Sequence, residues 1–259
     1  MRRSVHGLRR SLRAQVNRVI VLGGLVVLLP LVVVGERVRH GSGRRLLRWG
    51  LSIVAALCGV HFEVRGRPPA DRTGAVVVAN HSSPMDIPAL LWADPDVRFV
   101  ATAGLFRIPV LAAAMRAVGT VPIDRHDHDR AQRQLDRMAA RTDLVAGGDV
   151  AVFAEGGIAP AGQRLPFKTG AFSLAIRTRN PVVPVAIHGS DRVLVPRGRL
   201  LVRPGVVTVE FLAPVDTAGL TLDDRHVLRD HVRDLVCAAV ASGPPVVPVR
   251  GTPAGTAPG

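Results

Sequence analysis

The sequence predicts an α/β fold in which a mixed, largely parallel β-sheet is flanked by helices and preceded by an N-terminal two-helix segment that associates with a membrane. Three observations predict it. Apolar, β-branched runs alternate with helix-like segments from residue 63 onwards, as in α/β domains. A long stretch without charges lies before them. With 259 residues, the chain is long enough for one sizeable domain plus an appendage.

The N-terminal segment is basic and then apolar. Residues 1–18 contain six arginines and no acid, and residues 19–35 are 17 residues without a charge. As a helix this stretch would span about 25 Å, less than the hydrocarbon core of about 30 Å. A second apolar stretch, residues 49–62, follows another arginine-rich segment. Because arginines flank the first stretch on both sides, we expect an interfacial or re-entrant hairpin on the cytoplasmic face of the cell membrane, with a single-span anchor as the alternative.

The alternating elements after this segment define the main domain. Strands are predicted at residues 76–79, 97–101, 150–154, 182–187 and 206–212, and helices at residues 88–93, 109–118, 129–146, 171–179 and 221–241. The sequence thus divides into a membrane-associating segment (1–62), an α/β domain (63–242) and a Pro/Gly-rich tail (243–259) that is expected to be disordered.

Composition restricts the classes of partner. The net charge is +14, which favours an anionic membrane surface or nucleic acid. Nucleic acid is disfavoured because aromatic residues are 3% of the chain, tyrosine is absent, and no aromatic-basic platform is visible. Cys58 and Cys237 lie far apart in apolar surroundings and are expected to be buried thiols. Neither they nor the polar loop at residues 126–129 indicates a metal site.

The residues with the clearest chemistry are His81 and Asp86. The histidine stands where a predicted strand ends, and the aspartate follows five positions later at the start of a helix-like run. This pattern is typical of a general base with an orienting carboxylate. A structural interpretation is also open, because Ser83, Pro84 and Asp86 form a capping-box pattern. The two interpretations are compatible, since a carboxylate fixed at a helix start can also hold an imidazole.

Four later segments follow this motif in a characteristic order. They are residues 119–125 (GTVPIDR), 152–157 (VFAEGG), 167–170 (FKTG) and 182–185 (VVPV). Together with the His-x4-Asp element, the set resembles the phospholipid and glycerolipid acyltransferase family, which includes the 1-acylglycerol-3-phosphate (lysophosphatidic acid) acyltransferases. The resemblance covers roughly residues 63–189. It implies a glycerolipid acyltransferase-like fold.

The resemblance also implies a reaction. A fatty acyl group would move from an acyl thioester to the free hydroxyl of 1-acylglycerol-3-phosphate, giving phosphatidic acid. His81 would accept the hydroxyl proton, and Asp86 would hold the imidazole and stabilise the imidazolium. No metal, cofactor or covalent enzyme intermediate is required, because the thiolate of the donor is already a good leaving group. The donor would be acyl-coenzyme A or acyl-acyl carrier protein.

The family's other motifs imply the binding residues. Arg125 matches an arginine that holds the phosphate of the acceptor, and a guanidinium is well suited to that task. Glu155 and Gly156 match the Glu-Gly of the third motif, and Lys168 matches the Phe-Lys-x-Gly element that follows. Lys168 is the only lysine in the chain. The apolar segments 105–118 and 49–62 are expected to help line the acyl-chain site.

The sequence departs from the family in one motif. Where the family usually has Pro-Glu-Gly-Thr-Arg-Ser, residues 154–159 read AEGGIA, so the motif's arginine is absent. A basic residue early in the second motif is also missing. Either Arg125, Lys168 or Arg164 holds the phosphate alone, or the acceptor is another lysolipid, such as an aminolipid or glycolipid. A non-catalytic membrane-binding relative is a further alternative. A hydrolase is disfavoured, because the sequence contains no Gly-x-Ser-x-Gly elbow.

Overall fold

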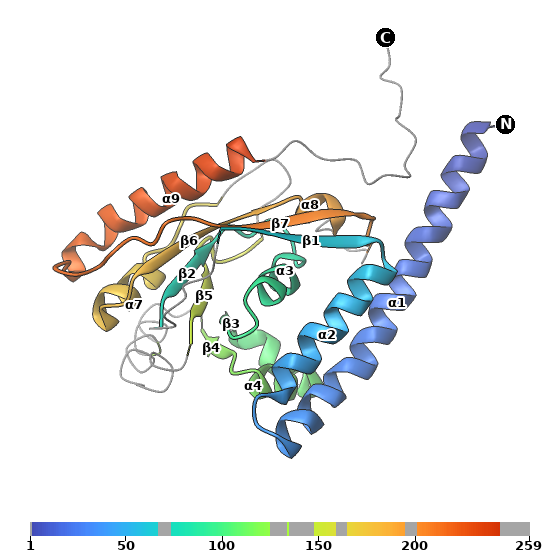
Figure 1. Ribbon diagram of the computed structural model, residues 1–259, viewed down its shortest axis with the longest axis horizontal. Helices are drawn as coiled ribbons and strands as arrows, with labels where there is room; N and C mark the ends of the chain where they lie inside the picture. Colours follow the sequence, from blue (N-terminus) through green and yellow to red (C-terminus); the bar gives the residue numbers. More distant parts are fainter. Residues whose placement is uncertain are drawn as a thin grey trace, which may run out of the picture.

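The centre of the protein is a seven-stranded β-sheet with the strand order β1-β7-β6-β2-β5-β3-β4 (Figure 1). The computed structural model describes residues 2–66, 74–124, 134, 148–158, 165–194 and 201–243. The strands are β1 (Val60–Arg65), β2 (Val76–Ala79), β3 (Arg98–Thr102), β4 (Val121–Ile123), β5 (Val150–Phe153), β6 (Val182–His188) and β7 (Gly205–Phe211). Neighbouring strands are parallel except for β6 and β7. The predicted mixed, largely parallel sheet is confirmed.

Helices cover both faces of this sheet. The described α-helices are α1 (Arg2–Val38), α2 (Ser42–Leu57), α3 (Asp86–Ala93), α4 (Pro109–Ala117), α7 (Gly170–Thr178), α8 (Ser190–Val193) and α9 (Arg225–Ser242). Two 3-10 turns, η1 (Ala103–Arg107) and η2 (Leu222–Asp224), precede α4 and α9. In Figure 1, α3 and the α1–α2 pair lie on one side of the sheet, and α7 and α9 lie on the other. The predicted helix at residues 129–146, apart from Gln134, and nearly all of the predicted tail lie outside the described residues.

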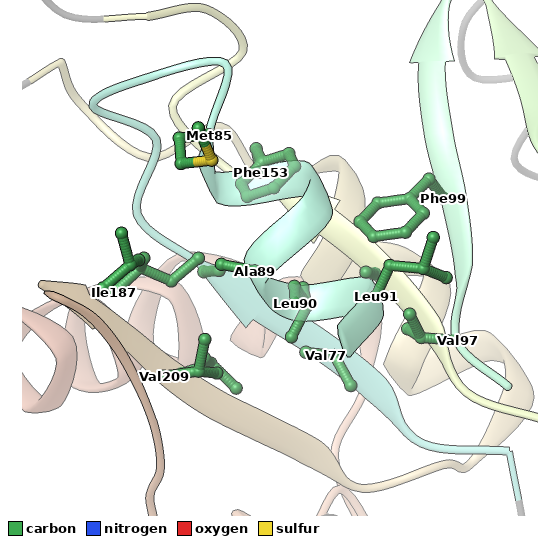
Figure 2. Close-up of a cluster of buried hydrophobic side chains, with 14 of the residues drawn as sticks. Val77, Met85, Ala89, Leu90, Leu91, Val97, Phe99, Phe153, Ile187 and Val209 are labelled. Atoms are coloured by element: carbon green, nitrogen blue, oxygen red, sulfur yellow. The ribbon is translucent and has the colours of Figure 1, made fainter. Parts of the chain in front are cut away.

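The central strand β2 is buried on both faces, which explains its unbroken apolar sequence. Val77 and Ala79 pack into the cluster beneath α3, whereas Val76 and Val78 pack into the cluster beneath α7 and α9. Figure 2 shows Leu90 of α3 above the first of these surfaces, between side chains from several strands. Because α3 is held by this core, the loop that connects β2 to α3 has fixed ends.

Strand β1 differs from the sequence-based expectation. Residues 49–62 form one apolar run, but α2 ends at Leu57 and β1 begins at Val60, after a turn at Gly59 with a φ of +73°. A boundary between residues 62 and 63 therefore falls inside a strand. A continuous apolar run does not reveal by its period where a helix gives way to a strand. β1 pairs with β7, which lies far along the sequence, and this long-range pairing makes the segment a strand.

The N-terminal helix is longer than its apolar part. It continues through Pro30 to Val38, and α2 returns antiparallel beside it after a turn at Gly41 (Figure 1). The Glu36 carboxylate accepts hydrogen bonds from the backbone N–H groups of Gly41 and Gly43, which fixes this turn. By length and composition, residues Gln15–Val38 could cross a membrane, with a mean hydropathy of 2.6.

The hairpin is docked on the domain. The side-chain amide of Asn17 donates to the Val202 carbonyl at 2.8 Å, and Asn17 is buried. Further along α1, Leu28 and Val32 are buried in a cluster with Ala114 and Val118 of the α4 region. The predicted two-helix segment is therefore present, and one side of it is part of the folded protein.

Candidate active site

The site lies at the carboxyl edge of the central strands. Strands β2, β5 and β6 are mutually parallel, so their carboxyl ends reach the same edge of the sheet. Such edges are where ligands bind in open α/β sheets. His81 follows β2, and Glu155 follows β5, so two residues 74 positions apart become neighbours.

Asn80 fixes the point where the chain leaves the sheet. Its side-chain Nδ2 donates to the Ile187 carbonyl at 3.0 Å, and its Oδ1 accepts the Ile187 N–H at 2.8 Å. The side chain thus replaces one more step of the β2–β6 ladder, which ends at Ala79 and Val185. After Asn80 the chain leaves the sheet and turns. His81 is the first residue of that turn, and Asn80 fixes where the turn begins.

The imidazole of His81 is held by Asp86. His81 Nδ1 lies 2.9 Å from Asp86 Oδ2, and the same oxygen accepts the backbone N–H groups of Ser82 at 2.8 Å and Ser83 at 2.9 Å. Asp86 is 0% exposed. Because an ionised carboxylate can only accept hydrogen bonds, the neutral imidazole carries its proton on Nδ1 and leaves Nε2 as an acceptor. The arrangement can therefore accept a proton at Nε2.

The predicted capping box is formed only in part, because α3 begins at Asp86 with Met85 rather than Ser83 at its N-cap, and no side chain caps it. The Asp86 carboxylate accepts the Ser83 N–H, as in a capping box, while Ser83 Oγ accepts the Met85 N–H at 3.2 Å rather than that of Asp86. Ser83 Oγ also donates to the Leu194 carbonyl at 2.7 Å. Helix α3 begins at Asp86. The turn that starts the helix is the same turn that orients the histidine.

An aromatic contact to His81 had no signal in the sequence motifs. The ring of Phe153 stacks on the imidazole with centroids 4.1 Å apart and planes inclined by 17°. Phe99 stacks in turn on Phe153 at 6.2 Å. Phe153 covers one face of the imidazole, and a π-face favours a neighbouring cation. Its position at the end of β5, two residues before Glu155, was the available clue.

Glu155 points into the protein. It is 6% exposed, its Oε1 accepts the backbone N–H of His81 at 3.0 Å, and its Oε2 accepts that of Leu165 at 3.3 Å. Burial raises the pKa of Glu155, the negative charge of Asp86 adds to that effect, and the two backbone hydrogen bonds oppose it. Each oxygen accepts one backbone N–H group, and one of these bonds holds the backbone of His81, while the expected substrate contact of Glu155 stays a prediction.

Gly156 and Lys168 are brought together beside Glu155. Gly156 has a φ of +71°, a conformation suited to glycine. A Cβ at this position would lie 2.9 Å from Cε of Lys168, so the lysine chain passes directly over the glycine. The backbone N–H of Lys168 donates to the Ala154 carbonyl at 2.8 Å. The other cations predicted near the phosphate, Arg125 and Arg164, lie outside the described residues.

Comparison with known proteins shows the family of this chain. A family profile described as acyltransferase matches residues 61–188. The 1-acyl-sn-glycerol-3-phosphate acyltransferase alpha of Mus musculus is 32% identical over 212 residues, covering 80% of this chain and 73% of that protein. The chain belongs to the phospholipid acyltransferase family. The prediction of an O-acyltransferase family from the sequence is thereby confirmed.

Other members of the family extend the comparison. A chloroplastic 1-acyl-sn-glycerol-3-phosphate acyltransferase of Brassica napus is 28% identical, and the match covers 82% of this chain but 61% of that protein. The crystal structure of the 1-acyl-sn-glycerophosphate (LPA) acyltransferase PlsC from Thermotoga maritima superposes with a TM-score of 0.74 at 27% identity. That match covers 90% of this chain and 96% of PlsC.

Proposed function

We propose that the protein transfers a fatty acyl group from an acyl thioester to the free hydroxyl of 1-acylglycerol-3-phosphate, giving phosphatidic acid for phospholipid synthesis. The observation that carries this proposal is the buried Asp86 carboxylate bonded to His81 Nδ1, which leaves Nε2 available at the carboxyl edge of the sheet. The names of the relatives support the acceptor. His81 and Asp86 are the proposed catalytic residues.

The reaction requires one proton to move twice. His81 Nε2 accepts the proton of the acceptor hydroxyl while that oxygen attacks the thioester carbonyl. The imidazolium is stabilised by Asp86 at Nδ1 and by the ring face of Phe153. The tetrahedral intermediate then expels the thiolate, which takes the proton from Nε2. An ester and a free thiol are formed, and the enzyme returns to its starting state without a cofactor or metal.

We infer that the α1–α2 hairpin brings this site to the membrane. Large apolar side chains are exposed along both helices: Val19, Leu22, Val26, Val27, Leu31, Val34, Val38, Trp49, Ile53 and Leu57. Arg37, Arg39 and Arg45 are exposed around the connecting turn, where they can meet anionic lipid headgroups. A hairpin docked along one side favours insertion into the cytoplasmic leaflet over a free-standing span. The acceptor would then reach His81 from the lipid phase.

One observation favours a second acceptor class. Ile158 stands where the family usually has an arginine, so one cation for a phosphate is missing. An amino- or glycolipid acceptor with a free hydroxyl would fit the same catalytic pair. The donor, acyl-coenzyme A or acyl carrier protein, is acidic in both cases and suits a chain with a net charge of +14.

The testing experiment measures thiol release from both kinds of acyl thioester. Lysophosphatidic acid and a phosphate-free lysolipid serve as acceptors, with His81→Ala beside the wild type. We expect release that needs lysophosphatidic acid and falls by about 10²–10⁴-fold in the variant. Turnover only with the phosphate-free lysolipid would select the second acceptor class. No turnover by folded, lipid-bound protein would contradict an enzymatic function and favour a non-catalytic membrane-binding relative.

A further inference from the structure

We propose that Lys168, guided over Gly156, is the cation that selects the phosphate group of the acceptor, in place of the arginine missing at Ile158. This inference rests on the proposed function, because it assigns a specificity-determining residue to the same site. It assigns the phosphate to a residue outside the altered third motif. It also assigns Gly156 a steric role rather than a substrate contact.

The first argument concerns the position of the lysine. Phe167 is buried in the core between the sheet and helices α7 and α9, and the Lys168 N–H is bonded to the Ala154 carbonyl at 2.8 Å. The backbone of Lys168 is therefore fixed alongside the end of β5. Its side chain is exposed, so the ammonium group can meet a ligand at the edge of the sheet. His81 lies at the same edge through its bond to Glu155.

The second argument concerns the direction of the side chain. A Cβ on Gly156 would lie 2.9 Å from Cε, 3.1 Å from Cδ and 3.1 Å from Nζ of Lys168. The last atoms of the lysine thus rest on a residue that has no side chain. Only glycine keeps this path open at a φ of +71°. Gly156 thus leaves room for the end of the Lys168 side chain beside the end of β5.

The third argument concerns charge. Among the residues that the structure describes, no carboxylate forms an ion pair with Lys168. The neighbouring Glu155 uses both oxygens for backbone N–H groups and is buried. The lysine charge is therefore not neutralised by the carboxylate beside it. An exposed ammonium beside Gly156, two residues before the position of the missing family arginine, suits a phosphate monoester.

The first test compares two acceptors that differ only in the phosphate. Thiol release is measured in detergent micelles with 1-acylglycerol-3-phosphate and with 1-acylglycerol of the same chain length. For Lys168→Gln we expect the KM for the phosphate-bearing acceptor to rise about 10-fold or more, with kcat within about 3-fold of wild type. Activity with 1-acylglycerol should not fall. Lys168→Arg should recover part of the loss, because it restores the charge.

A matched variant controls for the loss of one positive charge. Arg233→Gln removes an exposed cation from α9, on the far side of the sheet from α3, and should leave both KM values unchanged. An unchanged KM in Lys168→Gln, an equal loss with both acceptors, or the same effect in Arg233→Gln would each overturn the assignment. A wild-type protein that is inactive with 1-acylglycerol-3-phosphate would instead overturn the proposed function.

The second test addresses Gly156. Gly156→Ala should raise the KM for the phosphate-bearing acceptor because the new methyl group displaces the lysine chain. In a Lys168→Ala background no chain remains to be displaced and only the backbone strain at a φ of +71° is left, so the same substitution should raise KM by a smaller factor. Equal effects in both backgrounds would show that Gly156 acts through the backbone alone and would overturn its guiding role. Circular dichroism of all four proteins checks that each is folded.

Discussion

At the carboxyl edge of the sheet, the carboxylates of Asp86 and Glu155 are buried and hydrogen-bonded, whereas on the α1–α2 hairpin, large apolar side chains are exposed. Asp86 is fully buried and one of its oxygens accepts three hydrogen bonds. Trp49 on α2 is 72% exposed and packs on none of the buried clusters. Asp86 and Glu155 receive hydrogen bonds from within the chain, although the buried Oδ1 of Asp86 has no hydrogen-bond partner among the described residues. The hairpin packs one side on the domain and leaves large apolar side chains exposed on the other. The comparison shows that the donors around His81 are supplied by folding, whereas the exposed side of the hairpin supports the proposed contact with a membrane.

The largest effect is expected at the organised edge, from Asp86→Asn. The amide can still accept the Ser82 and Ser83 N–H groups, so the fold should persist, but it cannot stabilise an imidazolium. We expect kcat to fall about 10²–10⁴-fold with little change in KM, measured by thiol release. Ser82→Ala is the control, because it removes only the contact between Ser82 Oγ and Ser190 Oγ and keeps the backbone donor. A kcat within 10-fold of wild type would show that Asp86 only holds the turn through the Ser82 and Ser83 N–H groups.

The exposed hairpin is tested by a double substitution on one face of α2. Trp49 and Ile53 are four residues apart and both exposed, so Trp49→Glu with Ile53→Glu places two charges on the proposed lipid-facing surface. We expect binding to anionic vesicles to weaken about 10²–10⁴-fold in a sedimentation assay, because each of the two side chains contributes about 1.5–3 kcal/mol when buried. Activity with short-chain acceptors below their micelle concentration should be unchanged.

Val227→Glu gives the matched control for this surface. Val227 is also 72% exposed, but it lies on α9, away from the hairpin. Its substitution should leave vesicle binding unchanged. If the α2 double variant binds vesicles as well as the wild type does, the exposed face of α2 does not enter the membrane.

The smallest effect is expected from Glu155→Gln, which tests the role of Glu155 at the carboxyl edge of the sheet. Burial raises the pKa of Glu155, so the folded protein holds this proton more tightly than the unfolded chain does. Its contribution to the free energy of unfolding is therefore fully present below the unfolded pKa and is lost as pH rises through the folded pKa. Glutamine does not titrate. The stability of wild type relative to the variant should thus decrease with rising pH, starting just above the ordinary pKa of glutamate.

Urea denaturation at a series of pH values measures this difference. At neutral pH the variant also leaves one backbone donor facing an amide N–H group, which costs about 1–3 kcal/mol. Asp223→Asn, an exposed carboxylate, is the control and should give a curve parallel to that of the wild type. Parallel curves for Glu155→Gln as well would show that Glu155 titrates normally in the folded protein.

Local sequence patterns predicted much of this protein. Strand β2 was predicted with its observed bounds, and α3, α4, α7 and β5 to within two residues at each end. These elements have clear periods or apolar runs with distinct ends. His81 and Asp86 were predicted as a pair because they are five residues apart on one turn, so short-range geometry alone brings them into contact.

Long-range pairing decided the rest. Strand β1 forms because residues 60–65 pair with β7. Glu155 faces inward because its carboxylate accepts the backbone N–H groups of His81 and Leu165. The path of the Lys168 side chain over Gly156 depends on the packing of two segments that belong to different sequence motifs. The sequence by itself determined most strands and helices of the α/β domain, the pairing of His81 with Asp86 and the family. Only the tertiary structure decided where β1 lies, which carboxylate accepts the backbone N–H of His81 and which cation stays exposed, because these features depend on contacts between residues far apart in the chain.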